Sequence, residues 1–369
     1  MSGPLEGVVV LSLAEQYPGP YATLLLADLG ADVIMVERPG SGDPARAFPD
    51  FFSSIARNKR SICLDLKSEH ELQRFYRLVE QADVVLEGYA PGTAARLGIG
   101  YDRLKELQPR LIYASISGYG QTGPYRSRPG HDISFQAVAG LMHGQTGSGD
   151  DTPAAPFGDV SAAMFAAFAI VTALYAREKT KLGTYIDVSM TDALVSWLTP
   201  FVAISMNGGT PIDVTQSPAY GSFACADGRV LALSIAHEDH FWRRLCSLLT
   251  LPESAELGHA QRVQRRAVLR AEIAARILAR DLAYWSKELD AHAIPWAPVN
   301  DVTAVTTDPH FVSRGLFVDI PRADGSIERH VRQPVVFSSY STYVRLPTPG
   351  LGEHTDSVIA ALGSRKTDS

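Results

Sequence analysis

The stretch LIYASISGYGQTG (111–123) begins with an apolar, β-rich run and ends in closely spaced glycines. The run predicts a buried strand, and the glycines have the spacing of a dinucleotide-binding fingerprint. In such a fingerprint a helix begins at the last glycine, so that a pyrophosphate lies at the helix N-terminus. Here Pro129 and Gly130 stop any helix almost at once, and no carboxylate ends a strand about 20 residues later. We therefore interpret the glycines as a loop at the carboxyl end of a parallel strand, where α/β proteins bind their ligands.

Strand-like and helix-like segments alternate around this stretch through the first half of the chain. The alternation is typical of an α/β fold in which helices cover a parallel sheet. The second half begins with a predicted hairpin at 223–236, which turns at Asp227-Gly228, and continues with helices. The expected strands are 7–13, 32–39, 61–67, 83–89, 111–117 and 183–190, and the expected helices between them are 19–31, 68–82 and 160–179.

Composition argues against several classes of protein. The 369 residues are 46% hydrophobic and 20% charged, as in soluble globular proteins, and the length suggests two domains. A formal net charge of −6 argues against a general nucleic-acid or membrane-surface binder. Cys63, Cys225 and Cys246 are far apart, which fits a reducing cytoplasm and no metal site built from paired cysteines. We see neither a signal peptide nor a run of roughly 20 apolar residues, so we expect a cytoplasmic protein with no membrane partner.

Polar residues stand at three points beside predicted loops and helix starts: His131 in the triplet GHD, Asp159 before the long apolar helix, and Glu238 in AHEDHFW. Asp159 is either an N-cap that accepts backbone N–H bonds or a base or nucleophile that faces a ligand. His131 is either a structural hydrogen-bonding group or a catalyst. Glu238 could belong simply to the first turn of its helix.

Basic residues cluster early in the chain, at Arg38, within ARNKRS (56–61) and at Lys67. A solvated surface is one interpretation of this cluster. The alternative is a site for a polyphosphate, which arginine forks and lysine point charges match well.

Several segments together resemble the family III CoA-transferases, a family that includes formyl-CoA transferases, carnitine CoA-transferases and α-methylacyl-CoA racemases. The match covers nearly the whole chain, in order. The segments are LADLGADVIMVERPGSGD (26–43), RNKRSICLDLK (57–67), EGYAPGTAARLGIGYDRL (87–104), SISGYGQTGP (115–124), GTYIDVSMTDAL (183–194), IPWAPVNDV (294–302) and DPHFVSRG (308–315).

The resemblance implies a large Rossmann-like domain with a parallel sheet, built from both chain ends, a smaller α+β domain, and an interlocked homodimer. We accordingly expect the large domain at 1–197, a linker at 198–222, the small domain at 223–319 and a return to the large domain at 320–369. No prosthetic group is implied, because coenzyme A enters as part of the acyl-CoA substrate. The implied CoA contacts are Arg38, Ala56, Lys59, Leu66, Gly88, Arg96 and residues of the 118–131 loop such as Gly130.

For the reaction, the resemblance implies two alternatives that share one aspartate. In the transferases, an Asp at the position of Asp159 attacks an acyl-CoA thioester, and CoA thiolate converts the mixed anhydride into an aspartyl-CoA thioester. A free carboxylic acid is then the second substrate. In the racemases, this Asp and a His at the position of His131 lie on opposite faces of the α-carbon, where one removes the proton and the other returns it. Histidine suits that exchange because it titrates near neutral pH.

We predict epimerisation at C2 of a 2-methylacyl-CoA, with CoA transfer between carboxylic acids as the alternative. The triplet GHD (130–132) resembles the racemase motif, and Glu238 matches a racemase glutamate that comes from the partner's small domain and supports the histidine. The segment AYGSFACADG (219–228) also lacks the glycine run of formyl-CoA-type transferases. Against epimerisation, GHD also occurs in transferases, and residues 161–163 replace glycines of the racemase pattern. An idle acyl-CoA-binding protein is a third hypothesis, disfavoured because all three polar residues are present.

Overall fold

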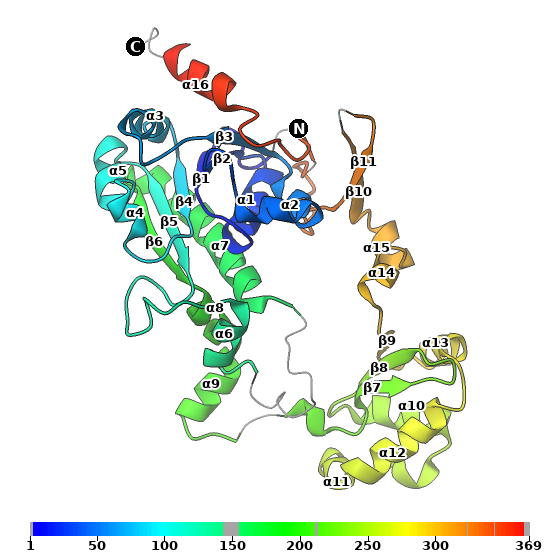
Figure 1. Cartoon of the computed structure of the whole chain (residues 1–369). Helices are drawn as coiled ribbons and strands as arrows, with labels where there is room; N and C mark the ends of the chain where they lie inside the picture. Colours follow the sequence, from blue (N-terminus) through cyan, green and yellow to red (C-terminus); the bar gives the residue numbers. More distant parts are fainter. Residues whose placement is uncertain (1–2, 143–154, 211–212, 323, 343, 365–369) are drawn as a thin grey trace. The chain divides into compact units, whose positions relative to one another are not determined.

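The computed structural model describes residues 3–142, 155–210, 213–322, 324–342 and 344–364 (Figure 1). The chain divides into two compact units, one made of Met1–Val202 with Ser313–Ser369 and the other made of Ala203–Val312. The first unit therefore contains both ends of the chain, whereas the second is a single continuous segment.

A six-stranded, fully parallel sheet forms the centre of the first unit. Most of its strands are buried on both faces, which explains why their sequences are continuous apolar runs. The strand order is β3-β2-β1-β4-β5-β6, so the direction of winding reverses between β1 and β4. The predicted α/β class with a parallel sheet is confirmed. The strands are β1 (Val9–Ser12), β2 (Asp32–Glu37), β3 (Lys59–Cys63), β4 (Val84–Glu87), β5 (Ile112–Ser117) and β6 (Thr184–Ser189).

Helices cover both faces of this sheet, because successive residues of a strand point to opposite sides. Val10 and Leu86 face one helical layer, whereas their chain neighbours Leu11 and Val85 face the other, and all four are fully buried. The first layer contains α1 (Pro18–Asp28), α6 (Asp132–Val138), α7 (Phe157–Thr180) and α8 (Met190–Trp197), and the second contains α3 (Glu69–Val79), α5 (Tyr101–Leu107) and α16 (Thr355–Ser364). Shorter connecting elements are η1 (Pro44–Ala47), α2 (Pro49–Ala56) and α4 (Thr93–Arg96).

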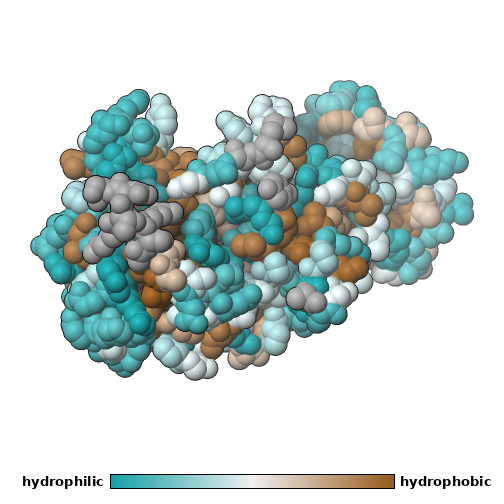
Figure 2. Space-filling view, turned by 90° about the horizontal axis from the view of Figure 1, so that it is seen from above, coloured by the Kyte–Doolittle hydropathy of each residue, from teal (hydrophilic) through white to brown (hydrophobic). Residues whose placement is uncertain are grey.

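Helix α7 is the long apolar helix expected at 160–179. Within the described part of the chain it alone is long and apolar enough to cross a membrane, but it packs on α1, β5 and β6 as a core helix does. Small side chains permit this close packing, and Ala162 and Ala163 are fully buried. Phe168 and Tyr175 of the same helix are exposed at 69% and 68%. Figure 2 shows apolar residues exposed between hydrophilic ones at several places on the surface.

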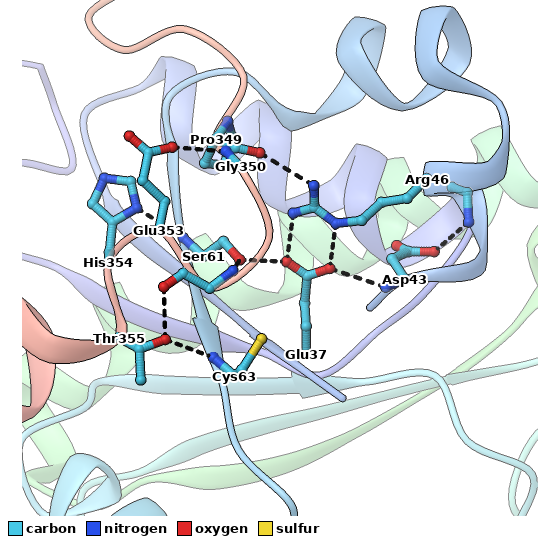
Figure 3. Close-up of polar contacts among 12 residues, drawn as sticks. Glu37, Asp43, Arg46, Ser61, Cys63, Pro349, Gly350, Glu353, His354 and Thr355 are labelled. Carbon is cyan, nitrogen blue, oxygen red and sulfur yellow. Dashed lines mark hydrogen bonds and ion pairs between the residues drawn. The ribbon is translucent and has the colours of Figure 1, made fainter. Parts of the chain in front are cut away.

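A polar network joins the C-terminal segment to strands β2 and β3 (Figure 3). Glu37 accepts hydrogen bonds from Arg46 Nε at 2.7 Å and from Ser61 Oγ at 2.6 Å. Arg46 also donates to the carbonyl of Pro349 at 3.2 Å, and Ser61 Oγ accepts the N–H of Gly352 at 2.8 Å. Since these bonds cross almost the whole length of the chain, they explain why its last part belongs to the first unit.

The second unit has its own core around a three-stranded antiparallel sheet. Strands β7 and β8 form the predicted hairpin, and Gly228 in its turn has φ +78°, which favours glycine. Trp242 and Trp285 are buried in this core and donate their indole N–H groups to main-chain carbonyls, both at 2.7 Å. The elements are β7 (Tyr220–Ala224), β8 (Val230–Ser234), α10 (Asp239–Leu249), η3 (Pro252–Ser254), α11 (His259–Gln264), α12 (Arg266–Ile277), α13 (Leu282–Ala291), β9 (Trp296–Pro298) and α14 (Val302–Val305).

The stretch 198–222 is not the plain linker that we expected. It contains helix α9 (Thr199–Met206), the 3₁₀ turn η2 (Val214–Gln216) and the start of β7. Asn207 and Gly208 directly follow α9, and Gly208 has φ +66°, a left-handed conformation that is common just after a helix. The small unit also ends before 319, because the segment after α15 (Pro309–Ser313) pairs strand β10 (Phe317–Pro321) with β11 (Ile327–Val331) inside the first unit.

Candidate active site

Asp159 lies in the first turn of α7, but its carboxylate does not cap that helix. Pro156 occupies the N-cap position, and the capping acceptor comes from another element. Asp132 Oδ1 accepts the N–H of Gly158 at 2.7 Å and the N–H of Asp159 at 3.1 Å, while the other oxygen accepts a hydrogen bond from Gln136. The N-cap interpretation of Asp159 is therefore wrong. Within the described ranges its carboxylate has no hydrogen-bond or ion-pair partner, so it is available to a ligand.

The surroundings of Asp159 favour its protonated form. Burial, and after it the negative charge of Asp132, raise the pKa of Asp159 to about 7. A carboxyl group with such a pKa is ionised in roughly half of the molecules at neutral pH. When the Asp159 carboxylate is ionised, no donor in the described chain forms a hydrogen bond with it. An unpaired carboxylate of this kind is what a nucleophile or a general base requires.

His131 stands immediately before α6, is exposed, and makes no capping hydrogen bond with its side chain. Because its neighbour Asp132 bonds the first turn of α7, His131 and Asp159 lie on segments in direct contact. In the residues that the structure describes, no hydrogen bond or ion pair joins their side chains. The prediction that they act from opposite faces of a substrate carbon stays a prediction.

Glu238 lies in the second unit, at the N-cap position of α10. Its side chain accepts the N–H of Ala236 at 2.9 Å and does not cap the helix. The hydrogen bond from its own N–H is the main cause that lowers the pKa of Glu238, and burial opposes it. Glu238 is therefore a charged group at a helix start, and its support of a partner's histidine stays a prediction.

Two of the expected CoA contacts line one pocket at the carboxyl ends of the strands. Arg38, which follows β2, and Leu66, which follows β3, enclose a volume of about 520 Å³ together with Glu15 and Tyr89. Glu15 follows β1 and Tyr89 follows β4, so the pocket lies at the reversal of winding, where such sheets bind ligands. Arg38 is exposed, and among the described residues its one ion-pair partner is Glu15, at 3.1 Å, so its guanidinium can turn to a phosphate at small cost.

Three other expected contacts lie on exposed loops or helix ends. Gly88 directly follows β4, and Arg96 ends α4 with a hydrogen bond of 2.8 Å to the Thr93 hydroxyl. Gly130 leaves no room for a larger residue, because an added Cβ would lie 2.8 Å from the Phe135 ring. Among the described residues, no group of three His, Cys, Asp or Glu side chains is placed to hold a metal ion.

Ala56 and Lys59 do not turn their side chains to this pocket. Ala56 is 1% exposed and packs with Met35 in a small core. Lys59 begins β3 and is equally buried, and its Nζ donates to the carbonyl of Pro20 at 2.7 Å. Burial lowers the pKa of Lys59 to about 7, although Asp43 opposes the effect. Both side chains are buried, so a CoA contact at either residue would have to come from the main chain, and these two contacts stay predictions.

Sequence reasoning missed Asp132 and Tyr17. Asp132 was visible in the triplet GHD, but its bond to a helix 26 residues away has no local signal. Tyr17 stands between β1 and α1, and its ring contacts Tyr21 with centroids 5.8 Å apart. Burial, then Tyr21 and then Asp159 raise the pKa of the Tyr17 hydroxyl, so Tyr17 lies within electrostatic reach of that carboxylate. The only sequence signal for Tyr17 is its place after a strand at the ligand-binding edge.

A buried chain of hydrogen bonds at the ends of β4 and β5 was also not foreseen. Glu87 accepts a hydrogen bond from the Ser115 hydroxyl, whose oxygen accepts one from Gln121 Nε2 at 2.9 Å. Burial raises the pKa of Glu87. Gln121 belongs to the glycine loop GYGQTG, so the network holds that loop against the sheet, and no helix begins at Gly123. The interpretation of these glycines as a loop is confirmed.

Comparison with protein families finds a match over nearly the whole chain. Residues 5–355 match the model of CoA-transferase family III. The chain is 34% identical to an "Acyl-CoA transferase" of Fusarium pseudograminearum, over 98% of this chain and 85% of that protein. It is 33% identical to the "Succinate--glutarate CoA-transferase" of Agrobacterium fabrum, over 97% and 96% of the two chains.

Solved structures agree as well. A CAIB/BAIF family protein from Brucella suis is 31% identical and superposes with a TM-score of 0.86, over 98% of this chain and 100% of that one. The two relatives named above are CoA-transferases and not racemases, so the comparisons favour the transfer alternative over the predicted epimerisation.

Proposed function

This chain belongs to CoA-transferase family III, and we propose that it moves coenzyme A from an acyl-CoA to a carboxylic acid with Asp159 as the nucleophile. The observation that carries the proposal is the state of the Asp159 carboxylate. Asp132 has taken over the capping of α7, so this carboxylate lies at a helix start without a partner in the described chain. Its pKa of about 7 leaves both an ionised and a protonated population at neutral pH.

Four displacements complete one turnover. The Asp159 carboxylate attacks the thioester carbonyl, the C–S bond breaks, and CoA leaves as the thiolate. The acyl group remains on Asp159 as a mixed anhydride. The thiolate attacks the aspartyl carbonyl, which releases the first acid as its carboxylate and leaves an aspartyl-CoA thioester. The acceptor carboxylate then attacks that thioester, and the released thiolate attacks the acyl carbonyl of the second anhydride. The products are a new acyl-CoA and free Asp159, with no net gain or loss of protons.

The residues around Asp159 have separate tasks in this scheme. Asp132 fixes the first turn of α7, so the main-chain position of Asp159 is set before substrate binds. The pocket with Arg38 and Leu66 is the proposed place for the nucleotide end of CoA, where Arg38 would pair with a phosphate. CoA takes part as substrate, and no prosthetic group enters the scheme.

We also expect two copies of this chain to form the interlocked homodimer implied by its resemblance. Exposed apolar side chains support an association, since Phe168 and Tyr175 lie on α7 and Phe201 and Met206 on α9, with exposures between 54% and 75%. Apolar surface of this kind is normally covered by a partner. The three free cysteines are compatible with the predicted cytoplasmic setting.

One incubation distinguishes transfer from epimerisation. The protein is mixed in D₂O with a branched acyl-CoA and an isotope-labelled acceptor acid, and mass spectrometry follows both CoA exchange and deuterium at C2. Transfer predicts new acyl-CoA from the labelled acid without deuterium uptake, an Asp159 adduct that hydroxylamine traps, and loss of both with Asp159→Asn. His131→Ala should retain CoA exchange. Deuterium uptake without exchange, abolished by His131→Ala, would instead establish epimerisation.

A further inference from the structure

The turn that follows strand β2 forms one wall of the pocket proposed for the nucleotide end of CoA. Arg38, Pro39 and Ser41 of this turn line the pocket of about 520 Å³, together with Glu37 at the end of β2. Because 60% of the Arg38 side chain is exposed, little packing restrains it. The region that its guanidinium can reach is therefore set by the main chain of the turn.

Glu37 closes this turn. Its Oε2 accepts the N–H of Asp43 at 2.9 Å, and the N–H of Gly42 donates to the carbonyl of Arg38 at 3.0 Å. The carboxylate of Asp43 accepts the N–H of Gln16 at 3.0 Å, which fixes the end of the turn to the segment after β1. A shift of the Glu37 carboxylate would therefore shift the main chain that carries Arg38.

Arg46 holds the Glu37 carboxylate with two hydrogen bonds. Its Nε donates to Oε2 and its Nη2 to Oε1, both at 2.7 Å, in the forked arrangement that fixes the geometry of an arginine–carboxylate pair. Only 5% of the Glu37 side chain is exposed. Burial raises the pKa of Glu37, but the hydrogen bonds that it accepts, led by those from Arg46, outweigh burial and lower the pKa below its ordinary value. Glu37 is therefore a buried, ionised group that depends on its partners.

The part of the C-terminal segment from Pro349 to Gly352 bonds to the same pair of side chains (Figure 3). Arg46 Nη1 donates to the carbonyl of Pro349 at 3.2 Å. The N–H of Gly352 donates to the Ser61 hydroxyl at 2.8 Å, and this hydroxyl donates to Glu37 Oε1 at 2.6 Å. Two separate contacts thus connect the end of the chain to the carboxylate that closes the turn.

Leu351 of the same segment packs on the turn itself. Gly42 has φ +63°, and a Cβ added there would lie 2.8 Å from Leu351 Cδ1 and 2.8 Å from Glu37 Oε2. No side chain fits between groups that are this close. The turn, Glu37 and the C-terminal segment are therefore in direct contact.

We propose that Glu37 is a positioning residue for coenzyme A, which places Arg38 for a phosphate of the nucleotide, and that Arg46 and the C-terminal segment hold Glu37 for this task. The inference rests on the part of the proposed function that assigns this pocket to the nucleotide end of CoA. Both Glu37 oxygens already accept hydrogen bonds, and their charge repels a phosphate, so Glu37 acts through the turn. Because coupling between two binding events is reciprocal, CoA should also strengthen the docking of the C-terminal segment.

Calorimetric titration with coenzyme A tests the inference. Arg46→Met removes the guanidinium from Glu37, and Arg46 is not among the residues that line the pocket. We expect the Kd of CoA to rise about 5- to 10-fold, because Arg38 then reaches the phosphate in a smaller fraction of the molecules. Arg60→Met is the matched control. It removes an arginine–carboxylate pair with Asp32, at the opposite end of β2, and should leave the Kd unchanged.

The double variant Arg38→Met/Arg46→Met identifies the route of the effect. If Arg46 acts through Arg38, the double variant should bind CoA with the same Kd as Arg38→Met alone. Fold-changes that multiply in the double variant would indicate a general weakening and overturn the inference, as would an unchanged Kd in folded Arg46→Met. Circular dichroism establishes folding. If Arg46→Met does not fold, Ser61→Ala, which removes the hydroxyl between Glu37 and Gly352, replaces it in the same comparison.

Hydrogen exchange of the wild type measures the same coupling at the C-terminal segment. CoA should slow exchange of the N–H groups of Gly352 and His354, which donate to Ser61 at 2.8 and 2.9 Å, and should leave the N–H groups between β10 and β11 unchanged. Equal exchange with and without CoA would overturn the task assigned to the C-terminal segment.

These binding measurements are independent of the chemistry at Asp159. Absence of CoA transfer and of an Asp159 adduct, in a protein that still binds CoA, would overturn the proposed reaction and leave the Kd values to decide this inference. A wild type that binds no CoA, or an unchanged Kd in Arg38→Met, would overturn the assignment of the pocket and this inference with it.

Discussion

Replacing Asp159 with Asn should stabilise the folded protein, and the gain should increase with pH. Burial and the Asp132 charge hold the pKa of Asp159 at about 7, whereas an unfolded Asp titrates near about 3.9. Between roughly pH 5 and pH 7 the folded chain keeps a proton that the unfolded chain has released. Because the folded state then binds more protons, the free energy of unfolding of the wild type falls as the pH rises through this window. An amide does not ionise, so the variant is free of this loss.

The size of the effect follows from the same window. Linkage gives about 1.36 kcal/mol per pH unit, hence at most roughly 3 kcal/mol between pH 5 and pH 7. Partial exposure of the carboxylate reduces this figure, and the N-terminus of α7 favours an anion by about 0.3–1 kcal/mol. We therefore expect the variant to gain about 1–2 kcal/mol over the wild type from pH 5 to pH 8. In a unit of this size that is about 2–8 °C in Tm.

Thermal unfolding followed by circular dichroism at pH 5 and pH 8 measures this gain directly. Ser161→Ala is the matched control, because Ser161 lies in the same turn, donates its hydroxyl to the Gly158 carbonyl at 3.0 Å and does not ionise. Its Tm difference from the wild type should be equal at both pH values. If the Asp159→Asn difference is also equal at both, or declines with pH, the carboxylate is not held in its protonated form and the reasoning fails.

Three further substitutions test how the site and the fold are held together. Asp132→Ala removes the acceptor at the start of α7 and should lower the free energy of unfolding by about 1–2 kcal/mol. Asp132→Asn keeps an acceptor oxygen and should lower it less, and the Tm values of the two variants measure the difference. Arg345→Leu removes a guanidinium that donates to three carbonyls at and after the end of α1, and the shortest of these hydrogen bonds is 2.7 Å. We expect the free energy of unfolding in urea to fall by about 2–4 kcal/mol and proteolysis of the C-terminal segment to become faster. Gly183→Ala would place a Cβ 1.9 Å from the carbonyl oxygen of Leu111, so we expect a loss above roughly 3 kcal/mol or insoluble protein, while the exposed neighbour Thr184→Ala should remain folded.

The amino-acid sequence by itself determined the class of fold and the position of the glycine loop. Strands that are buried on both faces of a parallel sheet need continuous apolar runs. Because such a run is a local property of the sequence, each run predicts its strand. Pro129 and Gly130 likewise exclude a helix from within their own segment. The resemblance carried by short motifs added the family, because those motifs are also continuous stretches of chain.

The tertiary structure alone decided which side chains meet. Asp132 accepts the N–H of Gly158, 26 residues later in the chain, and Lys59 is buried although its sequence resembles an exposed basic cluster. Such contacts depend on how the sheet and its helices are stacked, and no window of sequence contains both partners. For the same reason the N-cap interpretation of Asp159 could be rejected only after the competing acceptor, Asp132, was located in space.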